Sequence, residues 1–428
     1  MKAITLNLWV LLVCGCSDLT NVKAPDVVEP GELANADGAV ARYVGALTLF
    51  YGAYGANSQF DAGSLVFTTG LAADEFMNTA FASVNMALDS RAMAEDPGLA
   101  GGATFLALSR ARTNALAGIY ALEHYAPQPL SRIGQLFAVV GYTELFFAES
   151  YCSGLPLAEF TGDRPTGVDS YGTPLSRVEM LDRALEAFDS AAVNAGTTTA
   201  IQNLAAVGRG RVLLNLGRFA EAATAVSAVP TAFVYSSEHS TTINPNSLAQ
   251  AVGLSVADRE GTNGLDFRSA GDPRVVVVQG TGSQASQYLW AKIRSLAAPI
   301  TLASGIEARL IEAEAALQAG DTTTWLSLHN ALRATVAGLT PLADPGSAAA
   351  REDLHFRERA FWLFGQGQRL SDLRRLVRQY DRQVDAVFPV GAYTGPGASV
   401  YGSDVTMTPL LSLEVFNPNY TGCQDRDP

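Results

Sequence analysis

The chain has 428 residues, of which 48% are hydrophobic and 17% charged, a composition typical of a globular protein with a substantial core. Its formal net charge of -13 argues against nucleic acid or anionic lipid as a partner and leaves a neutral ligand such as a sugar open. Beyond the first residues, no apolar run is long enough to cross a membrane.

The N-terminus has the pattern of an export signal. Lys2 precedes an apolar run over residues 3–13 that is too short to span a bilayer, and small residues then lead to Cys16. A cysteine at this position is typical of a bacterial lipobox, in which it is lipidated and becomes the new N-terminus. We therefore expect a signal peptide over 1–15, lipidation of Cys16 and a polar, proline-bearing tether over 16–35. An ordinary cleaved signal with incidental cysteines is the alternative.

Helical periodicity begins near Asp37 and recurs along the chain. The length allows two modest domains or one large interrupted one, and we expect one interrupted domain over 36–428. Apolar residues fall on one helical face in 181–192, 306–317 and 370–377, and Gly196, Gly217 and Gly320 are placed to end helices. Around Gly217, the segment 213–222 has the pattern of the turn inside a tetratricopeptide repeat. The predicted fold is therefore mainly all-α, a scaffold of helical hairpins with irregular, partly β insertions.

A poorly periodic stretch at about 230–300 interrupts the repeats and is expected to face the ligand. It holds a strand-like valine run at 275–278, followed by Gly280-Thr281-Gly282, which imitates a dinucleotide-binding fingerprint. No clear helix opens after it and no alternating strand–helix pattern surrounds it. We therefore predict a glycine-rich hairpin turn here and expect no cofactor.

Four cysteines occur in the chain. Cys14 leaves with the predicted signal and Cys16 carries the lipid, so Cys152 and Cys423 remain. Two leftover cysteines in an exported protein suggest one disulfide, which would tie the C-terminal tail to the end of an early helix. Two free thiols are the alternative.

No catalytic or metal-binding motif is present in the sequence: it has no HExxH pair, no nucleophile elbow and no P-loop. The scattered histidines are expected to be surface or packing residues. Acidic residues at helical spacing, such as Glu307 and Glu314, and the arginines of 369–382 indicate solvated helix faces first. A surface glycoside hydrolase that uses two of the many carboxylates is an alternative that the sequence leaves open.

Aromatic residues outside the periodic helices are the better candidates for ligand contact. Sugars bind by stacking on flat aromatic faces and by hydrogen bonds to amides and carboxylates. Two clusters fit this chemistry, and their candidate residues are Phe76, Asn78, Phe81, Tyr288 and Trp290. Core packing is the competing role for each of them.

Segments spread over most of the chain, in the right order, resemble the SusD/RagB family of outer-membrane nutrient-uptake lipoproteins. After the lipobox these segments are Gly271–Arg274, Tyr288–Arg294, Glu307–Ala315, Leu328–Ala334, Arg357–Leu376, Phe388–Val390 and Phe416–Asn419. The strongest is Arg357–Leu376, which follows the family order Glu-Arg, an apolar helix, Glu-Gly-x-Arg and Asp-Leu-x-Arg. Gln366 stands where the family usually has glutamate.

The resemblance implies a tetratricopeptide scaffold and a non-catalytic lipoprotein that captures glycans, or peptides, outside the cell. It implies that the protein is lipid-anchored in the outer membrane, on the cell surface. The partner would be a SusC-like TonB-dependent transporter, over which the protein closes as a lid. The alternatives are the surface hydrolase and a repeat protein that only docks protein partners.

Overall fold

The computed structural model describes residues 33–56, 64–93, 101–158, 160, 171–250, 253–409 and 416–428. The predicted signal peptide 1–15, Cys16 and most of the tether therefore lie outside the described residues. Fourteen α-helices and eight short strands occur in the described ranges, which confirms the mainly all-α expectation. Every helix in these ranges is too short or too polar to serve as a membrane span.

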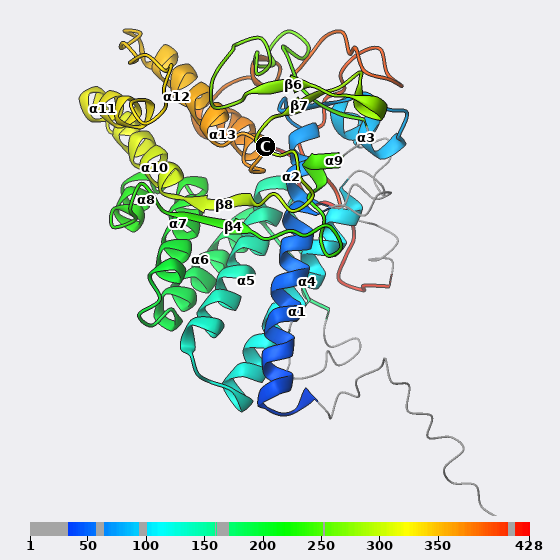
Figure 1. Ribbon diagram of the computed structural model, residues 1–428, viewed down its shortest axis with the longest axis vertical. Coiled ribbons are helices and arrows are strands. Elements are labelled where there is room, and N and C mark those ends of the chain that lie inside the picture. The colour runs from blue at the N-terminus through cyan, green and yellow to red at the C-terminus, as the bar shows by residue number, and fades with distance from the viewer. Residues whose placement is uncertain are drawn as a thin grey trace, which may run out of the picture.

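A stack of helical hairpins forms the lower part of the molecule (Figure 1). Helices that follow one another in this stack pack side by side, as expected for tetratricopeptide-like repeats. Its members are α1 (Ala36–Gly55), α4 (Gly102–Tyr125), α5 (Leu130–Ser150), α6 (Arg177–Asn194), α7 (Thr199–Asn215) and α8 (Phe219–Val226).

The predicted repeat turn lies between α7 and α8. Gly217 adopts a φ of 74°, which a glycine reaches without strain, and its N–H donates to the Leu214 carbonyl at 2.9 Å. The N–H of Arg218 donates to the Leu213 carbonyl at 2.8 Å. This pair of bonds is the Schellman motif, and it satisfies the last carbonyls of α7 and reverses the chain.

The remaining helices extend the stack and cover its upper end (Figure 1). α10 packs on α7 and α8, so it continues the stack after the insertion, while α13 packs on α5 and α2. These helices are α10 (Gly305–Gln318), α11 (Thr322–Arg333), α12 (Ala348–Trp362) and α13 (Arg369–Tyr380), with the shorter α2 (Leu65–Leu71), α3 (Ser83–Asp89), α9 (Ser247–Gln250) and α14 (Val384–Val387).

The insertion predicted at about 230–300 begins and ends on one antiparallel ribbon. β4 (Val234–Ser237) pairs with β8 (Ile300–Ser304), with Val234 opposite Ser304. Within it, β6 (Val277–Gln279) and β7 (Tyr288–Trp290) form a hairpin, so the valine run starts its strand two residues later than predicted. The glycines between β6 and β7 lie in the hairpin connection, which confirms the predicted turn over the dinucleotide-binding alternative.

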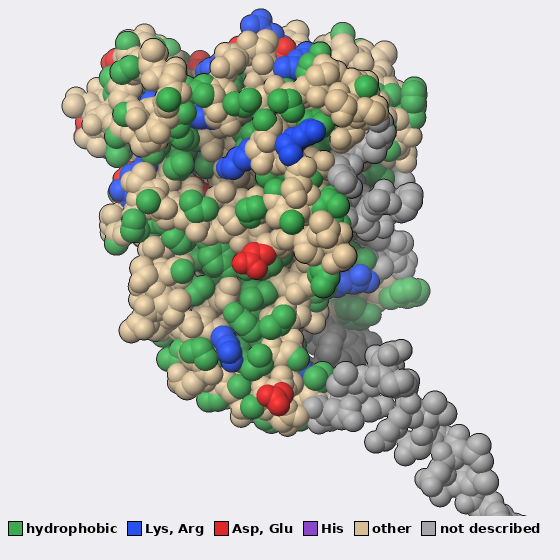
Figure 2. Space-filling view, in the orientation of Figure 1, with side chains coloured by type: hydrophobic (Ala, Val, Ile, Leu, Met, Phe, Trp, Pro, Cys, Tyr) green, Lys and Arg blue, Asp and Glu red, His purple; other side chains and the backbone are tan. Residues whose placement is uncertain are grey.

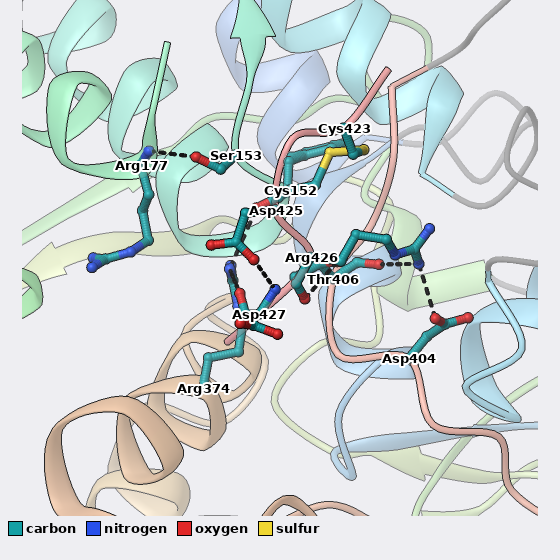
Figure 3. Close-up of a disulfide and its surroundings, with 11 residues drawn as sticks. Cys152, Ser153, Arg177, Arg374, Asp404, Thr406, Cys423, Asp425, Arg426 and Asp427 are labelled. Atoms are coloured by element: carbon teal, nitrogen blue, oxygen red, sulfur yellow. Dashed lines mark hydrogen bonds and ion pairs between the residues drawn. A yellow bond between two sulfur atoms is a disulfide. The ribbon is translucent and has the colours of Figure 1, made fainter. Parts of the chain in front are cut away.

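The C-terminal tail is fastened beside the end of α5 (Figure 3). Cys152 and Cys423 are joined by a disulfide with 5.7 Å between their Cα atoms. The Ser153 N–H donates to the Asp425 carbonyl at 2.8 Å, next to the short ribbon of β2 (Leu155–Pro156) and β3 (Pro174–Leu175). The segment around Cys423 therefore packs against the first half of the chain, although it lies far from it in sequence.

The expectation of a solvated face for the arginines of α13 is wrong. Arg369, Arg374 and Arg375 are buried, because α13 packs between α5 and α2. Arg375 pairs with Glu314 and with Asp372 at 3.2 Å, and Arg374 Nη1 donates to backbone carbonyls at the end of α5. Apart from Asp372, these partners come from distant parts of the chain, so helical spacing alone could not separate an internal charge network from a solvated face.

The acidic residues of α10 correct the sequence-based expectation in the same way. Glu307 and Glu314 are both buried. His355 lies 3.4 Å from Glu314, and its Nδ1 lies 3.0 Å from His329 Nε2. Both histidines are buried in this network and so have packing roles.

Candidate ligand-binding surface

The two aromatic clusters singled out in the sequence meet at the upper end of the molecule. β1 (Phe76–Asn78) pairs with β5 (Leu254–Val256), and β5 contacts β7 of the hairpin. Ser255 Oγ accepts a hydrogen bond from the Tyr288 N–H at 3.0 Å and links the two ribbons. Residues about 200 positions apart thus contribute to one surface.

Phe76 and Trp290 are part of the core beneath this surface. Both are buried, and both contact Phe364, at ring-centroid distances of 5.1 and 5.2 Å. Gly365 follows Phe364 and lies against the Trp290 ring. The two residues therefore belong to the core beneath the ribbons, and their faces are not free to stack on a ligand.

Asn78 shapes a turn of the chain. Its buried Nδ2 donates to the Ala80 carbonyl at 2.7 Å, while its Oδ1 accepts from the Ala80 N–H at 3.2 Å. This closed pair of bonds fixes the turn after β1. The next residue, Phe81, is 88% exposed and is the most exposed of the four aromatic candidates.

Tyr288 is half-buried and lies under a cation. The Arg268 guanidinium stands 4.1 Å from the centroid of its ring, and Asp258 holds that guanidinium at 3.4 Å. Sequence reasoning missed Arg268 and Asp258, since no motif connects them to Tyr288. Because Arg268 already orients the Tyr288 ring, a ligand that stacks on its exposed part would not have to order this side chain.

Charge is unevenly distributed over the face shown in Figure 2. Its lower part, over α1 and α5, carries few charged side chains, and basic side chains gather toward the end that holds β6 and β7 (Figure 2). On that end, Lys292 Nζ stands 5.4 Å from the Trp290 ring.

Among the depressions in the described part of the chain are two that aromatic and polar side chains line together. A small one beside Trp290, lined by Lys292 and Gln366 among others, has a cavity volume of ≈ 10 Å³, about the space of one water molecule. A larger one of ≈ 160 Å³ lies between α4 and the β2–β3 ribbon, lined in part by Phe105, Arg112 and Tyr171. No Asp or Glu lines either of these two depressions.

Buried acids lie beneath the surface, among them residues that sequence reasoning did not single out. Glu75 accepts the Gly365 N–H at 3.0 Å, and its burial raises its pKa to about 8. Asp89 and Glu260 interact with one another below the turn that carries Phe81, and both are buried. Asp74, next to Glu75, forms a two-pronged ion pair with Arg369 at 2.6 and 2.9 Å.

Comparisons with known proteins find a likeness in three-dimensional structure. Neither a protein-family sequence model nor a curated protein sequence matches this chain. A SusD superfamily protein from Bacteroides fragilis superposes with a TM-score of 0.70 and 14% identity, covering 90% of this chain and 99% of its own. The chain has the SusD fold.

Two further solved structures share the SusD fold with this chain. A SusD-like carbohydrate-binding protein from Bacteroides vulgatus superposes with a TM-score of 0.65 and 14% identity, over 90% of this chain and 97% of its own. A laminarin-binding SusD-like protein gives a TM-score of 0.65 and 12% identity, over 91% and 99%. At this identity the likeness establishes the fold, and the ligand has to be argued separately.

Proposed function

We propose that this chain is a non-catalytic substrate-capture protein of the SusD/RagB family that binds glycans. The observation that carries the proposal is the SusD fold over nine-tenths of the chain, shared with proteins described as carbohydrate- and laminarin-binding. The order of the family-like segments along the sequence supports it independently.

The chemistry of the candidate surface supports a sugar ligand. Sugar rings present flat apolar faces to aromatic side chains and hydroxyls to polar ones. Phe81 is exposed, and Tyr288 is half-buried with its ring oriented by Arg268. The Asn78 hydrogen bonds fix the backbone turn that carries Phe81, and Arg268 orients the Tyr288 ring, which lowers the entropy lost on binding.

We further propose a place and a partner for this capture step. Residues 1–15 would direct export, and lipid on Cys16 would hold the protein on the outer surface of the outer membrane. The partner would be a SusC-like TonB-dependent transporter, to which the protein delivers glycan as a lid. The lipobox pattern and the family-like segments of the sequence support this part of the proposal.

Calorimetric titration of the purified protein with oligosaccharides from laminarin, starch and other polysaccharides tests the glycan proposal. We expect at least one to bind, and we expect Phe81→Ala and Tyr288→Ala each to weaken that binding about tenfold, which corresponds to about 1.4 kcal/mol of lost contact. Phe416→Ala is the matched control because Phe416 is also exposed, at 82%, and lies in the C-terminal region. Its affinity should equal that of the wild type.

Two outcomes would contradict the proposal. Binding of no oligosaccharide in the panel would remove the glycan ligand. Release of shorter products from a bound glycan, abolished by one Asp or Glu substitution, would favour the surface hydrolase instead.

A further inference from the structure

Two buried carboxyl groups meet where three separate segments of the chain come together. Asp89 ends α3, just after the turn that carries Phe81, and Glu260 lies in the loop that follows β5. The two side chains are hydrogen-bonding neighbours. Both residues are buried, Asp89 completely and Glu260 with 7% of its surface exposed.

One oxygen of the Asp89 carboxyl group already has its donors. Oδ2 accepts the Asn78 N–H at 2.8 Å and the Tyr393 hydroxyl at 2.7 Å. The other oxygen, Oδ1, and Oε2 of Glu260 are buried without a hydrogen-bond donor among the described residues. Two ionised carboxylates offer only acceptors, whereas one proton between them supplies the donor that this contact lacks.

Charged and titratable groups around the pair do not supply a cation to it. Arg91 is the nearest buried cation along the chain, but its Nε and Nη1 donate to the Asp404 and Pro389 carbonyls. Its charge interacts with Asp385, Asp404 and Tyr401. Asp74 adds a further negative charge toward Glu260 and is itself neutralised by Arg369. The groups that face the pair are Tyr393 and Tyr401 from the C-terminal loop, Asp74 from the segment before β1 and, through Tyr401, Arg91.

We propose that Asp89 and Glu260 share one proton and act as a pH-operated latch that holds the Phe81 turn against the body of the protein. When the proton leaves, two buried negative charges repel one another. The contact between α3 and the loop that contains Glu260 is therefore weakened. The latch lies beside the Asn78 amide, so its opening loosens β1 and the turn that presents Phe81.

The titration range follows from burial. Burial raises the pKa of Asp89 to about 7, and burial together with the Asp89 charge raises the pKa of Glu260 well above its ordinary value. The folded protein therefore holds this proton more tightly than the unfolded chain, where an Asp pKa is about 3.9. The contribution to stability is complete at acid pH. It decreases as the pH rises through about 7, where Asp89 ionises, and it is lost fully only at the higher pKa of Glu260, where the shared proton leaves.

Hydrogen exchange of the Asn78 amide in the full-length protein tests the latch between pH 5.5 and 8.5, after correction for base catalysis. We expect wild-type protection to fall about tenfold or more across this range, because the folded pair still holds protons that the unfolded chain has already lost. In Glu260→Gln, whose amide donates permanently to Asp89, protection should stay constant. Glu123→Gln, which changes an exposed glutamate on α4, should behave as the wild type.

Three outcomes overturn the latch. The first is wild-type protection that is constant with pH, and the second is the same pH dependence in Glu260→Gln as in Glu123→Gln. The third is recovery of protection at pH 8.5 on addition of calcium, which would mean that the pair binds a cation. If Glu260→Gln does not fold, an NMR titration of the Asp89 and Glu260 carboxyl groups in the wild type tests the latch instead. Titration of both groups near pH 4 would contradict the shared proton. None of these measurements depends on glycan binding.

Discussion

Buried arginines connect parts of this molecule that are far apart in sequence. Arg369, at the start of α13, binds Asp74 with two parallel hydrogen bonds, and both side chains are almost completely buried. Replacing such a pair by apolar groups can be neutral, but removal of one partner leaves a buried charge without compensation. The contact therefore fixes how α13 sits against the segment before β1.

Arg369→Met should lower the free energy of unfolding by about 3–5 kcal/mol, because Asp74 then stays buried without its cation. Urea unfolding measures this difference. Arg218→Met is the control, since Arg218 and Glu221 form a surface ion pair 2.5 Å apart, and no measurable change is expected there. Equal unfolding midpoints for the two variants would contradict the role of the Asp74 pair.

At the residue scale, the sequence indicated aromatic candidates that lie near one another in the structure. It did not predict which of them are buried and which are exposed. Phe76, Trp290 and Phe81 were equivalent candidates by composition. Phe76 and Trp290 are core residues because both pack on Phe364, which lies far from Phe76 in the sequence. Phe81 is exposed because it lies on the turn that the Asn78 hydrogen bonds close. Burial depends on such distant partners, and a single sequence does not display them.

Packing between elements is close where α6 meets α5 and α7. The Phe188 ring of α6 lies against Gly141 of α5 and Gly208 of α7, and a Cβ added at Gly208 would come within 2.2 Å of Phe188 Cε1. Tyr142 contacts the same ring edge-on at 4.9 Å. The two glycines let the three helices approach around one aromatic side chain.

Gly208→Ala should therefore destabilise the protein by about 1–3 kcal/mol, the usual cost of overpacking a filled core. Gly45→Ala is the matched control, because no atom lies within 4 Å of its added Cβ on α1. This control should gain about 0.5–1 kcal/mol from a better helix former. Thermal unfolding of both variants checks the pair, and a Gly208→Ala variant as stable as the wild type would show that the α6–α7 contact can expand.

Helix ends were predictable because their signals are local. Gly196, Gly217 and Gly320 each follow shortly after the last residue of a helix, at Asn194, Asn215 and Gln318. The burial of the arginines in α13 was not predictable, because partners such as Asp74 and Glu314 lie on other elements. The pairing of β4 with β8 has no local signal either, since their side chains meet only after the insertion has folded back.

On the scale of the whole molecule, the disulfide connects residues 271 positions apart. It holds the tail beside the end of α5, where Arg374 also donates to the Asp427 carbonyl at 3.4 Å (Figure 3). A cross-link over so long a loop restricts the unfolded chain strongly, and the folded tail adds its own hydrogen bonds.

Cys152→Ala combined with Cys423→Ala should lower the free energy of unfolding by about 2–5 kcal/mol. Guanidinium unfolding with and without a reductant measures the effect. Reductant should shift the wild-type midpoint to that of the double variant and should leave the double variant unchanged. A wild-type midpoint that does not respond to reductant, although both thiols are shown to be free, would contradict this contribution.

The fold class was predictable from the periodicity and the family-like segments, and the SusD fold agrees with it. The relation between the insertion and α2, α3 and the C-terminal loop was not, because it depends on contacts such as Asp89 with Glu260 and Tyr393. These contacts join three segments that each look like ordinary loop sequence.

The β4–β8 ribbon has an evolutionary consequence. Its register places Val234 opposite Ser304, so the chain leaves the helical stack and returns to it at one point. Between these two residues, core residues such as Phe267 and Trp290 pack against Phe364, whereas insertions and deletions in the exposed loops need not move the helices on either side. A lineage with this architecture can therefore change what it recognises while it inherits an unaltered frame, and sequence divergence should be concentrated in the exposed loops between the two strands.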